Sequence, residues 1–342
     1  MTVVAQLRSE GILRLGGMKT GFRYRYADGT RAPRRQVERI QLLKIPPAWT
    51  AVAIDDSQSA WIQAVGKDKA GRWQYLYHQR AVEKRERRKH KRLVAFAKKI
   101  PLLRARVSRD LTRKDNSRER VLACMLRILS VCFLRPGSEE YASENGSYGI
   151  ATLRTRHVDV RGKTVRLRFN GKSGKGHIYT FEDKRIATVV RSLLKVGGRR
   201  VFTFQDETGA WKVVRRPHIN AYIKEAMGDA FSAKDFRTWA GTITCACALA
   251  RIGFDPLDSP AQLKKKIVAA VKETAETLGN TPAVCRASYI SPAVTHAFEA
   301  GRVIKRPVVA VSDLATSRGR LHYCERSLVR LLEEFGTPTK RG

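Results

Sequence analysis

The spacing of apolar residues divides the chain into a β-rich first part and a mainly helical second part. Before residue 80, apolar and aromatic residues alternate with polar ones at 21–30, 60–65 and 72–77, and turn residues such as the Asp-Gly of 28–29 and the run 66–71 separate them. Alternation with a period of two predicts half-buried strands. The sequence therefore predicts a small antiparallel β-rich domain at the start of the chain.

Apolar residues recur at helical spacing in much of the chain beyond residue 90. The clearest run is 118–134, which Asn116 or Ser117 can cap and which stops before Pro136-Gly137, so that Arg135 lies where the helix ends. Further helices are predicted at 184–196, 218–226, 237–252, 260–278, 292–299 and 318–335. The last of these is amphipathic, and we expect it to dock on the core of the second domain.

A short β-region interrupts the helices. Alternating runs at 157–160, 164–169 and 177–181 predict three strands, and the Gly-rich segment 170–176 joins the last two. The fold class is therefore α+β, with a β-rich domain at 1–88 and a larger, mainly helical domain with a three-stranded β-region at 89–342. The boundary lies in the basic run 81–92, which is also compatible with a solvated helix or linker.

Charge changes this picture by pointing to a partner. The 342 residues include 67 Lys and Arg against 31 Asp and Glu, a formal net charge of +36, and 43% of them are hydrophobic, as in a folded protein. A surplus of this size is typical of proteins that bind polyanions, and nucleic acid is favoured over a membrane surface. No apolar run approaches the roughly 18 residues of a membrane-spanning helix, and no secretory signal is recognisable, so a cytoplasmic location is expected.

The usual catalytic signatures are missing from the sequence. It has no nucleotide-binding P-loop, no cluster of carboxylates that suggests a two-metal site, and six cysteines without zinc-ligand spacing, which we expect to be reduced core residues. We therefore expect no nucleotide, metal or other cofactor. Phosphodiester chemistry would then rely on Arg and Lys to stabilise charge and on a side-chain oxygen as nucleophile.

Five segments carry the resemblance to a known family. They are Arg-Pro-Gly-Ser at the start of 135–149, Phe-Asn-Gly-Lys at 169–172, Lys-Asp-Phe-Arg at the start of 234–242, Leu-Gly-Asn-Thr-Pro at the start of 278–289, and GKDKAGRWQYLY at 66–77. In this order and spacing they resemble the motifs of type IB DNA topoisomerases, in particular the compact poxvirus and bacterial branch. The resemblance implies a monomer that closes as a clamp around double-stranded DNA and relaxes supercoils through cleavage of one strand, strand rotation and religation.

The resemblance also implies roles for individual residues. Tyr289 would attack the scissile phosphate and form a 3′-phosphotyrosyl ester. Arg135 and Arg237 would bind the non-bridging oxygens. Lys172 would protonate the departing 5′ oxygen, and Lys234 would assist that transfer.

Position 280 departs from the poxvirus pattern. The poxvirus enzymes have His at this position, whereas this chain has Asn280, which resembles the bacterial members. An amide can donate a hydrogen bond but cannot carry a proton at neutral pH. This difference leaves Lys172 as the general acid. The resemblance places further DNA contacts on the first-domain hairpin and the Gly-rich turn, at Lys67, Arg72, Tyr75, Tyr77 and Lys175.

Two other functions remain possible at this point. A tyrosine recombinase or integrase shares the Arg, Lys, Arg and Tyr set, but usually has His where this chain has Lys234 and begins with a helical domain. A non-catalytic architectural nucleic-acid-binding protein would explain the charge, but not the ordered motifs. Three of the proposed catalytic residues could instead have purely structural roles. Tyr289 could be a packing residue, Arg135 a cation at a helix end, and Arg237 a surface ion-pair partner of Asp235.

Overall fold

The computed structural model describes residues 1–309 and 321–336, and these form two compact units. The first unit is Met1–Lys89 and the second is His90–Gly342. One continuous helix, α3 (Gln79–Asp110), contains the point at which the units divide. The strongly basic run 81–92 is therefore helical rather than an irregular linker.

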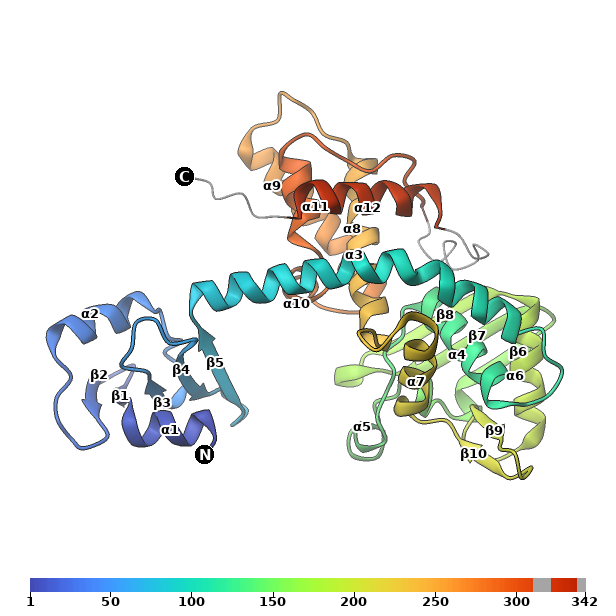
Figure 1. The fold of residues 1–342 in the computed structure, drawn as a ribbon, viewed down its shortest axis with the longest axis horizontal. Coiled ribbons are helices and arrows are strands. Elements are labelled where there is room, and N and C mark those ends of the chain that lie inside the picture. Colours follow the sequence, from blue (N-terminus) through green and yellow to red (C-terminus); the bar gives the residue numbers. More distant parts are fainter. Residues whose placement is uncertain (310–320, 337–342) are drawn as a thin grey trace. The chain divides into compact units, whose positions relative to one another are not determined.

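The first unit is an antiparallel sheet of five strands with two short helices (Figure 1). The strand order is β2-β1-β3-β4-β5, with β1 at Ile12–Gly17, β2 at Gly21–Tyr26, β3 at Thr50–Ile54, β4 at Ile62–Lys67 and β5 at Trp73–Tyr77. The predicted strands at 21–30, 60–65 and 72–77 correspond to β2, β4 and β5. The helices α1 (Val3–Glu10) and α2 (Arg34–Leu42) were not predicted.

Each face of this sheet has its own apolar core. Ile40 of α2 packs with Ile12, Ile54 and Ala64 on one face, whereas Leu7 of α1 joins a smaller cluster on the other. Each helix has a single fully buried residue. So few buried positions leave almost no helical periodicity to detect, which explains why the sequence pattern misses both helices.

The second unit is mainly helical, with one three-stranded sheet (Figure 1). After α3 its helices are α4 (Arg118–Cys132), α5 (Glu139–Glu144), α6 (Lys184–Val196), α7 (Arg216–Met227), α8 (Ala233–Ile252), α9 (Pro260–Leu278), α10 (Pro282–Ser288), α11 (Pro292–Glu299) and α12 (Tyr323–Phe335). The sheet has the order β6-β7-β8, with β6 at Val158–Arg161, β7 at Thr164–Asn170 and β8 at Gly176–Glu182. A small hairpin pairs β9 (Thr203–Gln205) with β10 (Trp211–Val213). The predicted α+β fold class is confirmed.

Two buried helices organise this unit. α4 packs against α6 and α7, and α8 packs against α7, α9, α11 and α12. Most residues of α4 and α8 are buried, so both helices lie inside the apolar core rather than covering one side of it. The site described below is built where α4 ends and where α8 begins.

The amphipathic helix expected near the end of the chain is α12, and its docking on the core of the second unit is confirmed. Cys324, Leu328 and Leu332 are fully buried in that core. Residues 318–320 of the predicted range lie outside the described residues. All six cysteines are buried and free, as expected. No helix among residues 1–309 and 321–336 has the length and apolar character that a membrane span requires.

Candidate active site

The buried guanidinium of Arg237 joins the ends of two other helices to α8. Arg237 is only 3% exposed. Its Nη1 donates to the carbonyl of Phe133, the residue that caps the end of α4, and its Nη2 donates to the carbonyl of Leu278, the last residue of α9, at 2.8 Å. Both contacts go to backbone carbonyls, and no carboxylate among the described residues forms an ion pair with Arg237.

The alternative interpretation of Arg237 as a surface ion-pair partner is wrong. Asp235 pairs with Arg92 instead, at 2.6 Å, and accepts hydrogen bonds from the backbone N–H and hydroxyl of Ser232 at the start of α8. Burial lowers the pKa of Arg237, and the nearby charge of Arg135 lowers it further. The two guanidinium groups therefore concentrate positive charge here, which a bound anion would stabilise.

Arg135 and Asn280 meet next to this guanidinium. Arg135 follows the end of α4, and its Nη2 donates to Oδ1 of Asn280. Asn280 follows Gly279, which ends α9 in the left-handed region at φ 63°. The Nδ2 of Asn280 is buried and forms no standard hydrogen bond with a described residue. Its neighbour is the thiol of Cys285: burial raises the pKa of that thiol, and the Asn280 side chain acts in the opposite direction. The amide therefore holds Arg135 with its oxygen.

Tyr289 lies at the end of α10, against Arg237. The guanidinium carbon of Arg237 is 5.1 Å from the centre of the Tyr289 ring. Two consecutive residues of α8 fix the backbone here: a methyl group at Gly241 would lie 2.7 Å from the Tyr289 carbonyl oxygen, and the Thr242 hydroxyl is 3.2 Å from the same oxygen. The Thr242 hydroxyl also accepts a hydrogen bond from the backbone N–H of Ser291, at 3.2 Å. These contacts fix the backbone of Tyr289, and its ring also packs against the apolar core of this unit.

Lys172 and Lys175 lie on the turn between β7 and β8, and both are exposed. Within the described part of the chain, the Lys172 side chain forms no hydrogen bond or ion pair. The turn is connected to the rest of the site by His177, whose ring lies against the backbones of Gly171 and Gly279. His177 was not predicted as a site residue, and only its position just after the Gly-rich turn could have drawn attention to it.

Lys234 is not brought into the cluster. It is exposed in the first turn of α8, three residues before Arg237, and none of the described residues forms a hydrogen bond or ion pair with its side chain. A three-residue separation puts the two side chains on the same side of the helix. The structure therefore gives Lys234 access to the site without a contact that holds it there.

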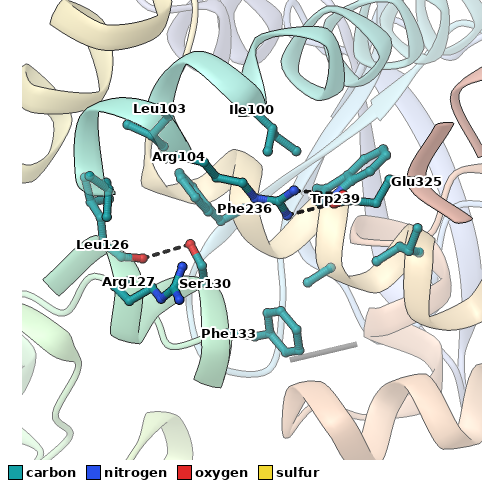
Figure 2. Close-up of a pocket in the computed structure, with 13 residues that line it drawn as sticks. Ile100, Leu103, Arg104, Leu126, Arg127, Ser130, Phe133, Phe236, Trp239 and Glu325 are labelled. Atoms are coloured by element: carbon teal, nitrogen blue, oxygen red, sulfur yellow. Dashed lines mark hydrogen bonds and ion pairs between the residues drawn. The ribbon is translucent and has the colours of Figure 1, made fainter. Parts of the chain in front are cut away.

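A buried ion pair joins α3 to α12 beside Trp239 of α8 (Figure 2). Arg104 of α3 donates to both carboxylate oxygens of Glu325 of α12, at 2.8 Å each, and Glu325 is fully buried. Trp239 of α8 lies beside the pair, with its Nε1 3.4 Å from Glu325. The cavity lined by these residues and by Phe133 has a volume of about 50 Å³, which suits a few water molecules but no nucleotide.

The predicted DNA-contacting hairpin of the first unit is the β4-β5 pair. Tyr75 and Tyr77 are 40% and 41% exposed on this edge strand, with ring centres 6.3 Å apart, and Trp73 precedes them on the same side of the strand. Lys67 lies over the Trp73 ring at 5.2 Å, and Arg72 pairs with Asp68. The three aromatic residues are therefore not divided between the two faces of the strand.

No group of three or more His, Cys, Asp or Glu side chains suited to hold a metal ion occurs in the two described segments. The site is thus built from two guanidinium groups, an amide and a phenol, with a lysine-bearing turn nearby. Chemically, such a set can bind a phosphate through charge and hydrogen bonds while an oxygen nucleophile lies beside it.

Comparison with known proteins agrees with this chemistry. Residues 78–299 match the family model of the eukaryotic DNA topoisomerase I catalytic core, and residues 21–68 match that of the bacterial DNA topoisomerase IB N-terminal domain. The chain is 35% identical to the DNA topoisomerase 1B of Acanthamoeba polyphaga mimivirus over 288 residues, which cover 82% of this chain and 85% of the relative. It is 23% identical to the DNA topoisomerase 1B of Vaccinia virus over 268 residues, 75% of this chain and 80% of the relative. With its order of motifs, its fold and these relatives, the chain belongs to the compact type IB DNA topoisomerases.

Proposed function

We propose that the cluster of Arg135, Arg237, Asn280 and Tyr289 is the catalytic centre with which this type IB DNA topoisomerase relaxes supercoiled duplex DNA. The observation that carries the proposal is the position of Arg237. Its buried guanidinium is fixed by two backbone carbonyls and lies against the ring of Tyr289, so that charge and nucleophile adjoin.

In the proposed cleavage step, the Tyr289 oxygen attacks the scissile phosphorus and its proton leaves to water. The bond from phosphorus to the 5′ oxygen breaks, which leaves a 3′-phosphotyrosyl ester and a 5′-hydroxyl strand. Arg135 and Arg237 stabilise the charge that develops on the non-bridging oxygens, a task suited to planar and permanently charged groups. The amide of Asn280 would supply a further hydrogen bond to the same oxygens.

Lys172 is the proposed general acid. It gives a proton to the departing 5′ oxygen and takes one back when that oxygen attacks the phosphotyrosyl ester during religation. Its exposed position on a turn, with no side-chain partner among the described residues, leaves it able to reach a bound strand. Lys234, on the first turn of α8, would assist the same transfer.

No ATP or metal ion is needed in this scheme. The phosphotyrosyl ester keeps the free energy of the broken phosphodiester bond, and supercoil relaxation itself is downhill. Strand rotation between cleavage and religation changes the linking number. The enzyme would act on both positive and negative supercoils.

We propose that both domains contact the DNA. We propose that residues 1–88 form a DNA-binding domain whose hairpin presents Lys67, Arg72, Tyr75 and Tyr77, and that residues 89–342 form the catalytic domain, with Lys175 near the cleaved strand. A monomer that closes as a clamp would suffice, and its place is the cytoplasm, on the nucleoid. With a net charge of +36, binding should weaken steeply as salt rises, because phosphate contacts release counterions.

A relaxation assay tests the proposed function. The purified chain should relax positively and negatively supercoiled plasmid in EDTA without ATP, whereas Tyr289→Phe should bind the same plasmid and leave it supercoiled. Relaxation by Tyr289→Phe would exclude the mechanism. Recombination between two defined sites would instead favour a tyrosine recombinase.

A further inference from the structure

His177 lies at the start of β8, between the turn that carries Lys172 and the turn that carries Asn280. In the β7-β8 ladder it is paired with Phe169, and the two ring centres are 5.6 Å apart. It also stacks on Tyr179, with ring centres 5.7 Å apart and an angle of 10° between the planes, and Phe169 and Tyr179 lie 6.2 Å from each other in the same aromatic cluster. These two neighbours fix the plane of the imidazole.

Two glycines allow this ring to touch both turns. A methyl group at Gly171 would lie 2.5 Å from Cδ2 of His177 and 2.6 Å from its Nε2. A methyl group at Gly279 would lie 2.5 Å from Cε1 of the same ring. The imidazole therefore fills the space between the backbones that immediately precede Lys172 and Asn280.

The backbone conformation of Gly171 does not itself require glycine, so the close approach of the His177 ring is what excludes a larger residue at position 171. Gly279 has a φ of 63°, which favours glycine whatever surrounds it. Gly171 has a φ of −93° and a ψ of −161°, a conformation open to any residue. The close approach of His177 is thus the constraint that a side chain at position 171 would violate.

Hydrogen bonding and charge keep the His177 ring neutral and oriented. The hydroxyl of Tyr179 and Nδ1 of His177 are hydrogen-bonded across 3.2 Å, which orients the ring. Burial raises the pKa of Tyr179 to about 12, so its phenol keeps its proton. Burial also lowers the pKa of His177, and nearby cations act in the same direction: Arg135, Lys175 and Arg237.

We propose that His177 is a positioning residue: by filling the gap between Gly171 and Gly279 it holds the turn of Lys172 at a fixed distance from the cluster of Asn280 and Arg135. The inference rests on the proposed role of Lys172 as general acid. The hydrogen bonds within the turn do not provide this link, because they run from Gly171 to Lys175 and from Gly174 to Gly171. One backbone bond, from Tyr148 N–H to the carbonyl of Asn170, holds the start of the segment, but among the described residues no backbone hydrogen bond joins the turn to the Gly279 backbone. The β-ladder fixes the strands, and His177 fixes the turn against α9.

The test uses the bond that Lys172 is proposed to help break. Single-turnover cleavage is measured with the full-length protein on a duplex that has an ordinary 5′ oxygen at the scissile phosphate, and on one with sulfur at that bridging position. A thiolate leaves without a proton because thiols titrate near pH 8.5, far below an alcohol. A variant that has lost only its general acid is therefore rescued by sulfur, and Lys172→Ala sets the reference for this rescue.

We expect His177→Ala to slow cleavage of the oxygen substrate by at least about tenfold, since small displacements of a catalytic group are costly. On the sulfur substrate the same variant should cleave within about threefold of the unchanged protein, as Lys172→Ala does. His177→Phe, which keeps a flat ring in the gap, should recover most of the loss. His218→Ala, on α7 against Phe204, is the matched histidine control and should cleave both substrates normally.

A second pair of variants leaves His177 in place. Gly171→Ala puts a methyl group against the ring and should show the same sulfur-rescued defect, whereas Gly176→Ala, whose added methyl would have no neighbour closer than 4.0 Å, should not. The Gly171→Ala defect should shrink when combined with His177→Ala, because the contact is then removed.

Two results would overturn the inference. One is normal cleavage of the oxygen substrate by His177→Ala, and the other is an equal loss on both substrates. If the unchanged protein does not cleave DNA, or if Lys172→Ala is not rescued by sulfur, the proposed function or the acid assignment fails instead. The two failures are therefore distinguishable.

Discussion

The hydroxyl of Thr242 offers a sharp test of how α8 holds the nucleophile. Thr242 is fully buried, accepts a hydrogen bond from the backbone N–H of Ser291 and lies within hydrogen-bond distance of the Tyr289 carbonyl. The hydroxyl is also 2.9 Å from the carbonyl of Thr238, one turn earlier in α8, so its single proton is shared between this carbonyl and that of Tyr289. Thr242→Val keeps the shape of the side chain and removes all three interactions. The backbone on either side of Ile290 then loses its link to α8.

The same helix provides a matched control. Thr244 is 3% exposed, and within the described part of the chain its hydroxyl has no hydrogen-bond partner. Thr244→Val therefore removes a buried polar group that contributes no hydrogen bond. The two variants differ in whether the lost hydroxyl holds the Tyr289 segment.

The expected magnitudes follow from these contacts. Leaving the Ser291 N–H buried without an acceptor should lower the free energy of unfolding of Thr242→Val by about 1–3 kcal/mol. Thr244→Val should be as stable as the unchanged protein or more stable. Because Tyr289 is positioned through the same backbone, single-turnover cleavage by Thr242→Val should fall by roughly tenfold or more, with DNA affinity unchanged.

Denaturant unfolding and single-turnover cleavage of a short duplex measure the two effects. Both variants are assayed beside the unchanged protein at one salt concentration, since DNA affinity depends on salt. Equal stability and equal cleavage rates for Thr242→Val and Thr244→Val would refute the reasoning, because the hydroxyl of Thr242 would then have no part in holding Tyr289.

Three further outcomes are expected. Arg237→Lys keeps a positive charge but cannot span two carbonyls, so single-turnover cleavage should fall by at least about 100-fold; a rate near normal would contradict the role of the fixed guanidinium. Glu325→Gln removes the charge of a fully buried carboxylate that pairs with Arg104, and denaturant unfolding should show a loss of about 1–3 kcal/mol. Burial and two neighbouring arginines lower the pKa of His157 to about 4, below its ordinary 6.5, so the unfolded chain binds a proton that the folded chain does not. Stability should therefore fall as pH drops from 6.5 to 4, and His157→Asn should flatten that slope in pH-dependent unfolding; an unchanged slope would contradict this origin.

The parts of the fold that were predicted correctly are those with strong local signals. The helices α6, α9 and α11 begin and end at the predicted residues, because Asp183 and Ser259 cap the first two and Pro follows Ser259 and Ser291. α10 was missed although Thr281 and Pro282 form a start signal. Its seven residues bury only Cys285, so helical periodicity is absent.

For the site, too, the sequence identified some features and not others: it identified the motif residues but not the contacts that hold them together. Arg135, Arg237, Asn280 and Tyr289 could be singled out in the sequence because each lies in a motif that resembles those of type IB topoisomerases. The contacts that assemble them go largely to backbone atoms, such as the carbonyls of Phe133 and Leu278, which every residue type possesses. Such partners leave no pattern in the sequence.

The same reason explains why His177 and Thr242 were missed. His177 acts on the backbones of two glycines, and Thr242 on backbone groups 47 and 49 residues away along the chain. Neither contact has a local spacing that can be detected before the chain is folded. Lys234 is the opposite case: the motif includes it, yet the structure gives its side chain no described contact in the cluster.

The most direct test of the central claim is to trap the covalent complex and map its linkage. A duplex with a nick just beyond the cleavage site loses its short 5′-hydroxyl strand, so the cleaved state accumulates. Proteolysis and mass spectrometry of the complex should locate the nucleotide adduct on Tyr289, and end-labelled DNA should show that the protein is attached to the 3′ phosphate. An adduct on any other residue, or attachment to a 5′ end, would contradict the account.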